Sequence, residues 1–247
     1  MSSVDYTIYY QRYHQPTKEY AEEVAAHFID LLERAGVSQL PRTARVLDVG
    51  CGMGFCLGAY SRLGFTENLG VDVSATQIQI AKSLGFNSMH VDDTERFLRD
   101  HRGAFDLVSA FDVIEHVPKQ EQLALAQAIC DSLKPGGKLV ATVPNANSAW
   151  ASRHRYNDWT HTSSFTEVSL HFLLANAGFR DIRVLDLEPK RPAYPFVLRP
   201  RVAAWIVRKM FRGVRRLDAM LQLGRAEAKS LPLSLNILGV ASRDYAE

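Results

Sequence analysis

The chain has 247 residues, of which 47% are hydrophobic and 23% charged, with a net charge of +2, as expected for one large globular α/β domain with a small appendage. Three cysteines, without a Cys-x-x-Cys pair, argue against a disulfide framework or a zinc site. The longest apolar run, residues 202–207, is far shorter than the ~20 residues that cross a bilayer, and the first residues lack the pattern of a signal peptide, which predicts a cytoplasmic protein.

Helices and short apolar strands alternate along the chain. The first helix is expected over 17–35, with Gly36 as its C-terminal cap. Further helices are expected over 55–63, 74–84, 120–133 and 166–177, and strands over 45–49, 68–72, 89–91, 105–111, 138–143, 181–187 and 234–242. This order predicts a Rossmann-like, doubly wound α/β sheet whose ligands lie beyond the carboxyl ends of the parallel strands.

Two segments interrupt the alternation. Residues 144–164 are expected to form a long loop, and 189–232 a helical insertion before the last strand. The chain therefore divides into an N-terminal helical cap over 1–44, a central domain over 45–188 and 233–247, and the insertion.

The first strand runs into a G-x-G-x-G turn at residues 50–54. Glycine allows positive φ and close approach of the backbone to a ligand, although an ordinary tight turn has the same pattern. Asp72 ends the next strand, where it is either a ribose-binding acid or a solvated acid at a strand end. A nicotinamide-dependent oxidoreductase would need G-x-G-x-x-G, but Phe55 occupies its third glycine position, and Asp48 would repel a diphosphate.

These motifs resemble those of the class I S-adenosylmethionine (SAM)-dependent methyltransferases. The matching segments are Val46-Leu-Asp-Val-Gly-Cys-Gly-Met-Gly54, Gly70-Val-Asp-Val-Ser74, Asp93-Thr-Glu95, the run from Phe105 to His116, and Leu133-Lys-Pro-Gly-Gly137. The resemblance covers residues 45–187 and the strand 234–242. It implies a SAM-binding central domain with a seven-stranded sheet whose last strand is antiparallel.

The resemblance also implies which residues bind SAM. The methionine portion is assigned to Asp48, Gly50, Cys51, Gly52 and Gly54. The ribose is assigned to Asp72, with Val73 beside it, and the adenine edge to Asp93 and the Thr94 amide, with Asp92 as a competing candidate. Phe111 and Asp112 are expected to line the sulfonium side.

Methyl transfer to an oxygen needs a base or a metal that promotes loss of the acceptor proton. His116 follows Glu115 immediately after a strand, and His161 lies in the loop 144–164 over the same edge of the sheet. Each histidine is either a catalytic base or a polar loop residue with one hydrogen-bond partner. Asp158 and Trp159 are expected to shape the acceptor pocket, unless Trp159 serves only in packing.

A metal is the alternative to a free base. Asp112, Glu115 and His116 are spaced i, i+3, i+4, so one helical turn would gather them, and His161 would complete an N/O site for Mg²⁺ or Mn²⁺. The set resembles the Glu-x-x-Glu-His plus distant His pattern of small-RNA 2′-O-methyltransferases and ubiquinone-pathway O-methyltransferases. This chain has Asp at the first position.

The insertion contains a basic amphipathic helix over 201–223, and residues 190–217 contain nine Lys or Arg and no Asp or Glu. The helix either covers the domain with its apolar face, leaving its arginines in solvent, or contacts an anionic membrane or a phosphorylated acceptor. Four prolines predict an extended arm over 189–200. No RNA-binding module is recognisable, which argues against nucleic acid as a partner.

Together these features predict a SAM-dependent methyltransferase that acts on a hydroxyl, cytoplasmic or peripheral at the inner face of the membrane. The stretch over 156–179 resembles bacterial methyltransferases associated with surface-glycan assembly, which implies a saccharide or a lipid-linked glycan as the leading acceptor. A quinone-pathway phenol is second and an RNA 2′-hydroxyl third. A catalytically silent SAM-binding scaffold would share the same motifs.

Overall fold

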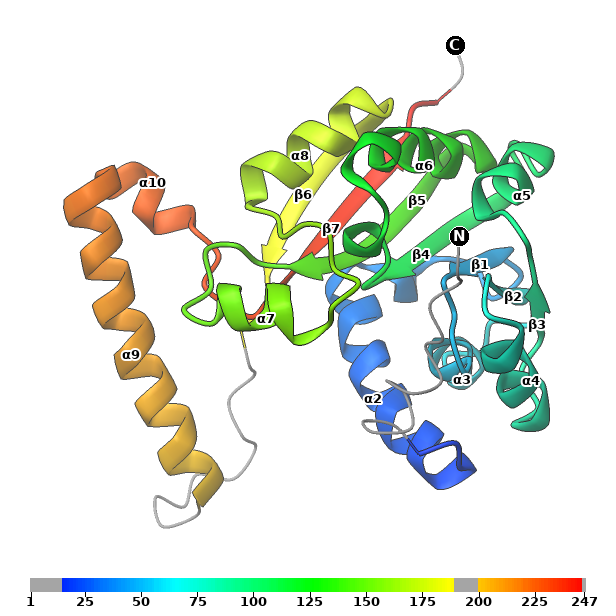
Figure 1. Ribbon diagram of the computed structural model, residues 1–247, viewed down its shortest axis with the longest axis horizontal. Helices are drawn as coiled ribbons and strands as arrows, with labels where there is room; N and C mark the ends of the chain where they lie inside the picture. Colours follow the sequence, from blue (N-terminus) through cyan, green and yellow to red (C-terminus); the bar gives the residue numbers. More distant parts are fainter. Residues whose placement is uncertain (1–14, 189–199, 246–247) are drawn as a thin grey trace.

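The computed structural model of the protein describes residues 15–188 and 200–245, and its centre is a sheet of seven strands (Figure 1). The strands are β1 (Val46–Val49), β2 (Asn68–Asp72), β3 (Ser88–His90), β4 (Phe105–Phe111), β5 (Leu133–Pro144), β6 (Phe179–Asp186) and β7 (Asn236–Arg243). Their order is β3-β2-β1-β4-β5-β7-β6, and β7 alone is antiparallel to its neighbours β5 and β6. The predicted doubly wound sheet with an antiparallel last strand is confirmed.

Helices cover both faces of the sheet (Figure 1). One face carries α2 (Lys18–Arg34), α3 (Phe55–Arg62) and α4 (Ala75–Ser83), and the other α5 (Thr94–Asp100), α6 (Lys119–Ser132) and α8 (Glu167–Asn176). All four residues of β1 are buried, because the strand is covered on both sides. Its side chains alternate, so Val46 packs with Tyr60 of α3 and Leu47 packs with Ile129 of α6.

Local capping explains several of the predicted ends. Gly36, with φ +76°, follows α2 in the left-handed conformation that suits glycine. The Ser74 hydroxyl accepts a hydrogen bond from the Gln77 amide and begins α4. Helix α5 was not expected from the sequence, although Asp93 caps it by accepting from the Arg96 amide at 3.0 Å.

The loop expected over 144–164 is only partly a loop, because α7 (Ala151–Asn157) forms within it. A 3₁₀ turn, η2 (Ile114–His116), follows β4, and another, η1 (Val37–Gln39), follows α2. The expected arm over 189–200 lies outside the described residues, except that Pro200 begins the next helix.

The insertion before β7 forms α9 (Pro200–Leu223) and the short α10 (Arg225–Ser230). Helix α9 stands beside the sheet and its helices (Figure 1), and Ala219 packs with Ala228 of α10 and Leu231. Its basic side faces the domain: Arg212 pairs with Asp186 of β6. Of the two alternatives for this helix, the one in which its apolar face covers the domain is therefore wrong, because that face is exposed. None of the described helices has the length and hydropathy needed to span a bilayer.

Candidate functional site

The site lies where β1, β2 and β4 end side by side, at the point where the strand order reverses. A cleft of about 540 Å³ opens there. It is lined by predicted site residues from the ends of four strands, β1 to β4, namely Gly50, Asp72, Val73, Asp92, Asp93, Thr94, Asp112 and His116. The order of the strands therefore brings together residues that are up to 66 positions apart in the chain.

The glycine turn has the conformation that the sequence predicted. Gly50, Gly52 and Gly54 all have positive φ, at +66°, +53° and +82°. A Cβ on Gly50 would lie 2.6 Å from a methyl carbon of Val113, and one on Gly54 would lie 2.8 Å from the Phe86 ring. Side chains at these two positions would therefore be both strained and obstructed. Cys51 of the same turn is buried and packs against Gly70.

Asp72 joins the turn to the end of β2. Its carboxylate accepts hydrogen bonds from the Gly52 amide at 2.9 Å and from the Ser74 amide at 2.7 Å. Burial raises the pKa of Asp72, and these two amides oppose the shift because they stabilise the charged form. Asp72 is therefore an oriented acid, held at the rim of the cleft.

The two candidate acids for the adenine edge differ in how their oxygens are used. Asp93 lines the cleft, but its Oδ1 caps α5 through the Arg96 amide. Asp92 is exposed and also lines the cleft, as does Thr94. Both acids remain candidates for the adenine edge, although one carboxylate oxygen of Asp93 is already used in capping α5.

A second cleft of about 220 Å³ adjoins the first and shares Gly50, Asp112 and His116 with it. It is further lined by Asp48, Cys51, Phe111 and Asp158, and by Val24 and Phe28 of α2. The Phe28 and Phe111 rings are 5.2 Å apart. The N-terminal helix thus forms part of the site, which the sequence did not reveal because its apolar spacing only indicated a packed face.

Asp48 is almost fully buried at this second cleft. The Ser109 hydroxyl of β4 donates a hydrogen bond to its Oδ1. Burial raises the pKa of Asp48 from 3.8 to about 7, although the Ser109 hydrogen bond opposes this. Asp48 is consequently an acid whose charge depends on what enters the cleft near neutral pH.

Asp112 is held at the junction of the two clefts with φ +53°, which is rare outside glycine. Its Oδ1 accepts hydrogen bonds from the Thr142 hydroxyl and the Asn236 amide, each at 2.9 Å. The residue is exposed at the cleft. The protein around its carboxylate nevertheless removes part of the surrounding water, and this desolvation raises the pKa of Asp112. Neither Thr142 nor Asn236 was expected, because no local pattern marks them.

Three of the four proposed metal ligands lie together. Candidate ligand atoms of Glu115, His116 and His161 are all within 4.8 Å of one another. The His116 and His161 rings meet edge to face at 4.6 Å. Asp112, the fourth, is outside this group. The 3₁₀ turn η2 places Glu115 and His116, whereas His161 comes from the loop after α7.

Glu115 is fully buried, and both of its carboxylate oxygens lack a hydrogen-bond partner among the described residues. Burial raises the pKa of Glu115 well above its usual value, and the neighbouring Asp112 carboxylate adds to the shift. A buried, unsatisfied carboxyl is costly to the fold, which points to a functional role beside the two imidazoles.

Hydrogen bonds fix the tautomer of His116. Thr160 donates its hydroxyl proton to Asp158, at 2.6 Å between the two oxygens. The Thr160 oxygen, 2.8 Å from His116 Nδ1, must therefore accept, so Nδ1 is protonated and Nε2 carries the lone pair. Burial, and then the nearby His161, lower the pKa of His116 to about 4, which keeps this ring neutral. The Asp-x-Thr turn at 158–160 was the sequence signal for this arrangement.

The His161 ring, like that of His116, is held by a hydrogen bond from its Nδ1. Its Nδ1 lies 3.0 Å from the backbone carbonyl of His154, which can only accept, so Nδ1 donates, and in the neutral ring Nε2 carries the lone pair. Asp158 is buried at the second cleft, as expected of a residue that shapes it. Trp159 is 88% exposed and lines neither of these two clefts, so it neither packs against the protein nor shapes them in this structure.

Comparison with known families matches residues 18–184 to a methyltransferase domain. Among curated proteins, the ubiquinone biosynthesis O-methyltransferase of Xanthomonas campestris pv. campestris (strain B100) is 34% identical over 169 residues, which are 60% of this chain and 68% of that protein. The protein of the same name from Xanthomonas axonopodis pv. citri (strain 306) is 32% identical over 123 residues, 48% of this chain and only 50% of its own length.

Solved structures share the fold at lower identity. A SAM-dependent methyltransferase from Archaeoglobus fulgidus has a TM-score of 0.69 and 21% identity, with 97% of this chain and all of that chain covered. The [4+2]-cyclase SpnF has a TM-score of 0.60 and 20% identity, covering 92% and 83% of the two chains. Because proteins of different named activities share this architecture, the fold alone does not determine the reaction.

Proposed function

Because the chain belongs to the SAM-dependent methyltransferase family, we propose that it transfers the SAM methyl group to a hydroxyl whose proton is removed at the Glu115–His116–His161 cluster. The observation that carries this proposal is the convergence of a buried carboxyl, which has no hydrogen-bond partner in the described part of the chain, with two imidazoles that are both hydrogen-bonded through Nδ1. Such a cluster is costly to fold and is suited to accepting a proton.

The residues that line the two clefts suit the polar and charged groups of SAM. Asp72 would bind the ribose hydroxyls, and Asp92 or Asp93, with the Thr94 amide, the adenine edge. Asp48 and the glycine turn would hold the cationic methionine end, where a Cβ at position 50 would collide with Val113. When bound, SAM supplies an electrophilic methyl group, so the protein mainly aligns the acceptor and removes its proton.

Proton removal is assigned to His161, with His116 and Glu115 beside it. The His154 carbonyl holds the His161 ring with its basic Nε2 available for a proton. The Asp158–Thr160 hydrogen bonds hold His116 in the same tautomer. Burial raises the pKa of Glu115, and proton uptake by this residue removes a negative charge next to the Asp112 carboxylate.

The same three residues would fit a divalent cation. A buried carboxylate and two neutral imidazoles form a donor set that Mn²⁺ accepts readily, and Mg²⁺ less so because it prefers oxygen. A cation there would lower the pKa of an acceptor hydroxyl and would satisfy the two unpartnered oxygens of Glu115.

For the acceptor, the names of the curated relatives favour a quinone-pathway phenol over a saccharide. The second cleft supports the same choice, because the Phe28 and Phe111 rings suit stacking against an aromatic acceptor. A lipid-linked glycan stays the second candidate, from the resemblance of residues 156–179 to glycan-associated methyltransferases.

The test measures methyl transfer from isotopically labelled SAM to catechols and to saccharides. His161→Ala should reduce turnover by at least ~100-fold while leaving SAM affinity unchanged, because the base is removed but the cofactor cleft is intact. His154→Ala is the matched control, because it keeps the backbone carbonyl that orients His161. Unchanged turnover in His161→Ala would refute the assignment of the base.

A catalytically silent SAM-binding scaffold makes a different prediction. It would bind SAM, but labelled methyl would reach no acceptor, and His161→Ala would change nothing. Mass spectrometry of lipids and glycans from cells with and without the protein separates the two acceptor classes, since only one class would lose a methyl group.

A further inference from the structure

The outer face of α9 is apolar and exposed. Seven hydrophobic side chains on this face are between 39% and 80% exposed, namely Ile206, Val207, Met210, Phe211, Val214, Leu217 and Leu221. Between the first and the last, the helix extends about 22 Å. A continuous apolar stripe of this length exceeds what soluble proteins usually leave in contact with water, and it indicates a binding surface.

The polar side of α9 fixes this orientation. Arg212 pairs with Asp186 and Glu188, and Lys209 also pairs with Glu188. Arg216 donates a hydrogen bond to the Leu231 carbonyl at 2.6 Å. These contacts hold the basic side against the domain, so the apolar face cannot turn inward without breaking them.

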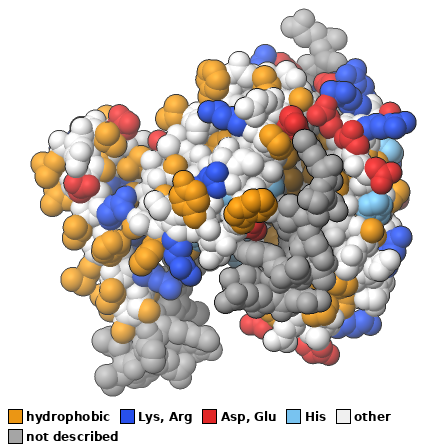
Figure 2. Space-filling model, viewed as in Figure 1, with side chains coloured by type: hydrophobic (Ala, Val, Ile, Leu, Met, Phe, Trp, Pro, Cys, Tyr) orange, Lys and Arg blue, Asp and Glu red, His pale blue; other side chains and the backbone are white. Residues whose placement is uncertain are grey.

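A second exposed apolar surface lies next to α9. Trp150, Tyr156 and Trp159, in and around α7, are 62%, 77% and 88% exposed. Arg215 of α9 donates a hydrogen bond, at 3.0 Å, to the carbonyl of Asn147, just before α7. Figure 2 shows hydrophobic side chains along α9 and over α7 on one side of the molecule. The two surfaces are therefore linked, and both are visible on the side of the molecule seen in Figure 2.

We propose that α9 and α7 dock the protein onto an anionic membrane, with the apolar face of α9 at the acyl boundary and the α7 aromatics at the headgroups. Residues 201–223 contain six Lys or Arg and a single acid, Asp218, so the helix as a whole is positively charged. Although several of these cations contact the domain, Arg208 of α9 and Arg153 of α7 are exposed and can attract an anionic surface. Exposed tryptophan and tyrosine are typical of side chains at the membrane interface.

A second copy of the chain fits this surface less well. The positions of Val207, Met210, Val214, Leu217 and Leu221 follow the 3–4 spacing of a helix pair. However, the positions that flank this stripe carry only one charged residue, Asp218, so no opposite charges would specify a partner helix. Pairing would also bring together two helices with the same excess of positive charge.

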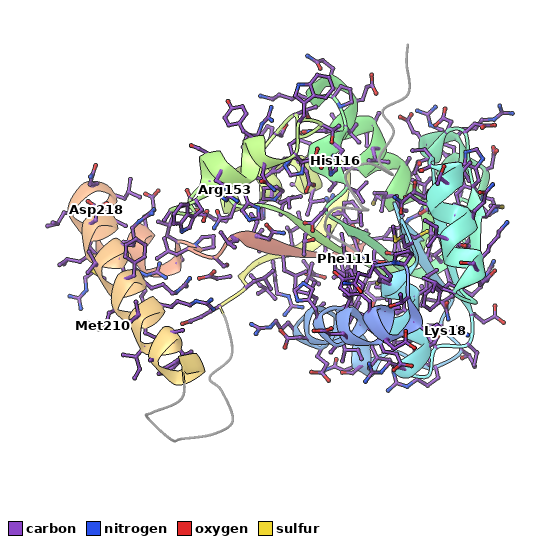
Figure 3. The ribbon with its side chains drawn as sticks, turned by 60° about the horizontal axis from the view of Figure 1, so that its bottom comes forward. Lys18, Phe111, His116, Arg153, Met210 and Asp218 are labelled. Atoms are coloured by element: carbon purple, nitrogen blue, oxygen red, sulfur yellow. The ribbon has the colours of Figure 1, made fainter. Side chains whose placement is uncertain are left out.

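Docking in this orientation has a consequence for the site. The loop that follows α7 carries Asp158, which lines the second cleft, and Thr160 and His161, which contact His116 of that cleft. Figure 3 shows Arg153 of α7 between His116 and the α9 residues Met210 and Asp218. The membrane would therefore lie beside the site, within reach of a lipid-borne acceptor; this last step rests on the proposed function, whereas membrane docking itself does not.

The experiment is flotation of the full chain with vesicles of phosphatidylcholine, alone or mixed with phosphatidylglycerol. The wild type should float with the anionic vesicles, less so at high salt. Met210→Asp with Leu217→Asp should reduce flotation at least about tenfold, because two charges enter the apolar stripe. Val168→Asp with Phe172→Asp on α8 is the matched control, since these apolar residues are equally exposed but lie on another helix.

Both double variants should bind SAM with wild-type affinity, because all four positions are exposed. Leu221→Asp, at the most exposed position of the stripe, repeats the test with a smaller change. Wild-type protein that does not float, or equal flotation of the α8 and α9 variants, would overturn the proposal. A dimer in light scattering that the α9 variant dissociates, without flotation, would assign the stripe to a second copy instead.

Discussion

Replacing Asp48 by Asn tests the electrostatics at the floor of the second cleft. The change removes the charge but keeps the shape and an oxygen that can accept from Ser109. Burial raises the pKa of Asp48 from 3.8 to about 7, so the folded protein holds this proton more tightly than the unfolded chain. The stabilisation from that proton is present at low pH and is lost as pH rises through about 7.

The size of the stability change follows from the size of the Asp48 pKa shift. Above both pKa values, the buried charge costs about 4 kcal/mol of folding free energy. Asp48→Asn should match the wild type near pH 4, then gain about 1.4 kcal/mol per pH unit up to pH 7, and stay constant above it. At pH 8 without SAM, its Tm should be roughly 10 °C higher than that of the wild type.

Thermal unfolding across this pH range measures the gain, and calorimetry measures SAM affinity. At pH 8 the variant should bind SAM at least about tenfold more weakly, because a charge-assisted hydrogen bond to the cationic end of SAM is lost. Asp92→Asn, an exposed acid of the neighbouring cleft, should leave Tm within roughly 2 °C. Parallel pH profiles for wild type and Asp48→Asn would refute the reasoning.

Three further predictions concern the turn, the histidine pair and the metal. Gly50→Ala should destabilise the protein by at least about 2 kcal/mol in denaturant melts and weaken SAM binding, because a Cβ there meets Val113; Gly85→Ala, with positive φ but open space, should cost only about 1 kcal/mol. Thr160→Val should lower kcat roughly tenfold, and Thr160→Ser should restore it, because only the hydroxyl orients His116; equal losses in both variants would argue for packing instead. If a cation occupies the Glu115 cluster, EDTA should abolish turnover and Mn²⁺ should restore it, whereas a metal-free base predicts unchanged rates.

The order of strands and helices and the glycine turn were predictable because local sequence specifies them. Apolar runs, capping residues and glycines with positive φ act over a few positions, so β1, the turn at 50–54 and the acid Asp72 could be located in advance. The regular α/β alternation then fixed which strand ends meet, because right-handed crossovers leave few topologies.

Contacts between distant segments were not predictable. Asn236 reaches Asp112 across 124 positions, and Phe28 of the N-terminal helix reaches Phe111. The hydrogen bond between Thr160 and His116 depends on how the loop after α7 folds over η2. In each case the residue type is common, and only its position in space gives it a role.

Helix α9 shows most clearly which properties the sequence specifies and which depend on tertiary contacts. Its sequence determined that the helix would be amphipathic, with apolar residues on one side and arginines on the other. Which side faces the domain was decided by the tertiary structure, because Asp186 and Glu188 at the end of β6 offer negative partners to the arginines. A helix carries its two faces in its own sequence, but its docking depends on the charges and surfaces that the rest of the chain presents to it.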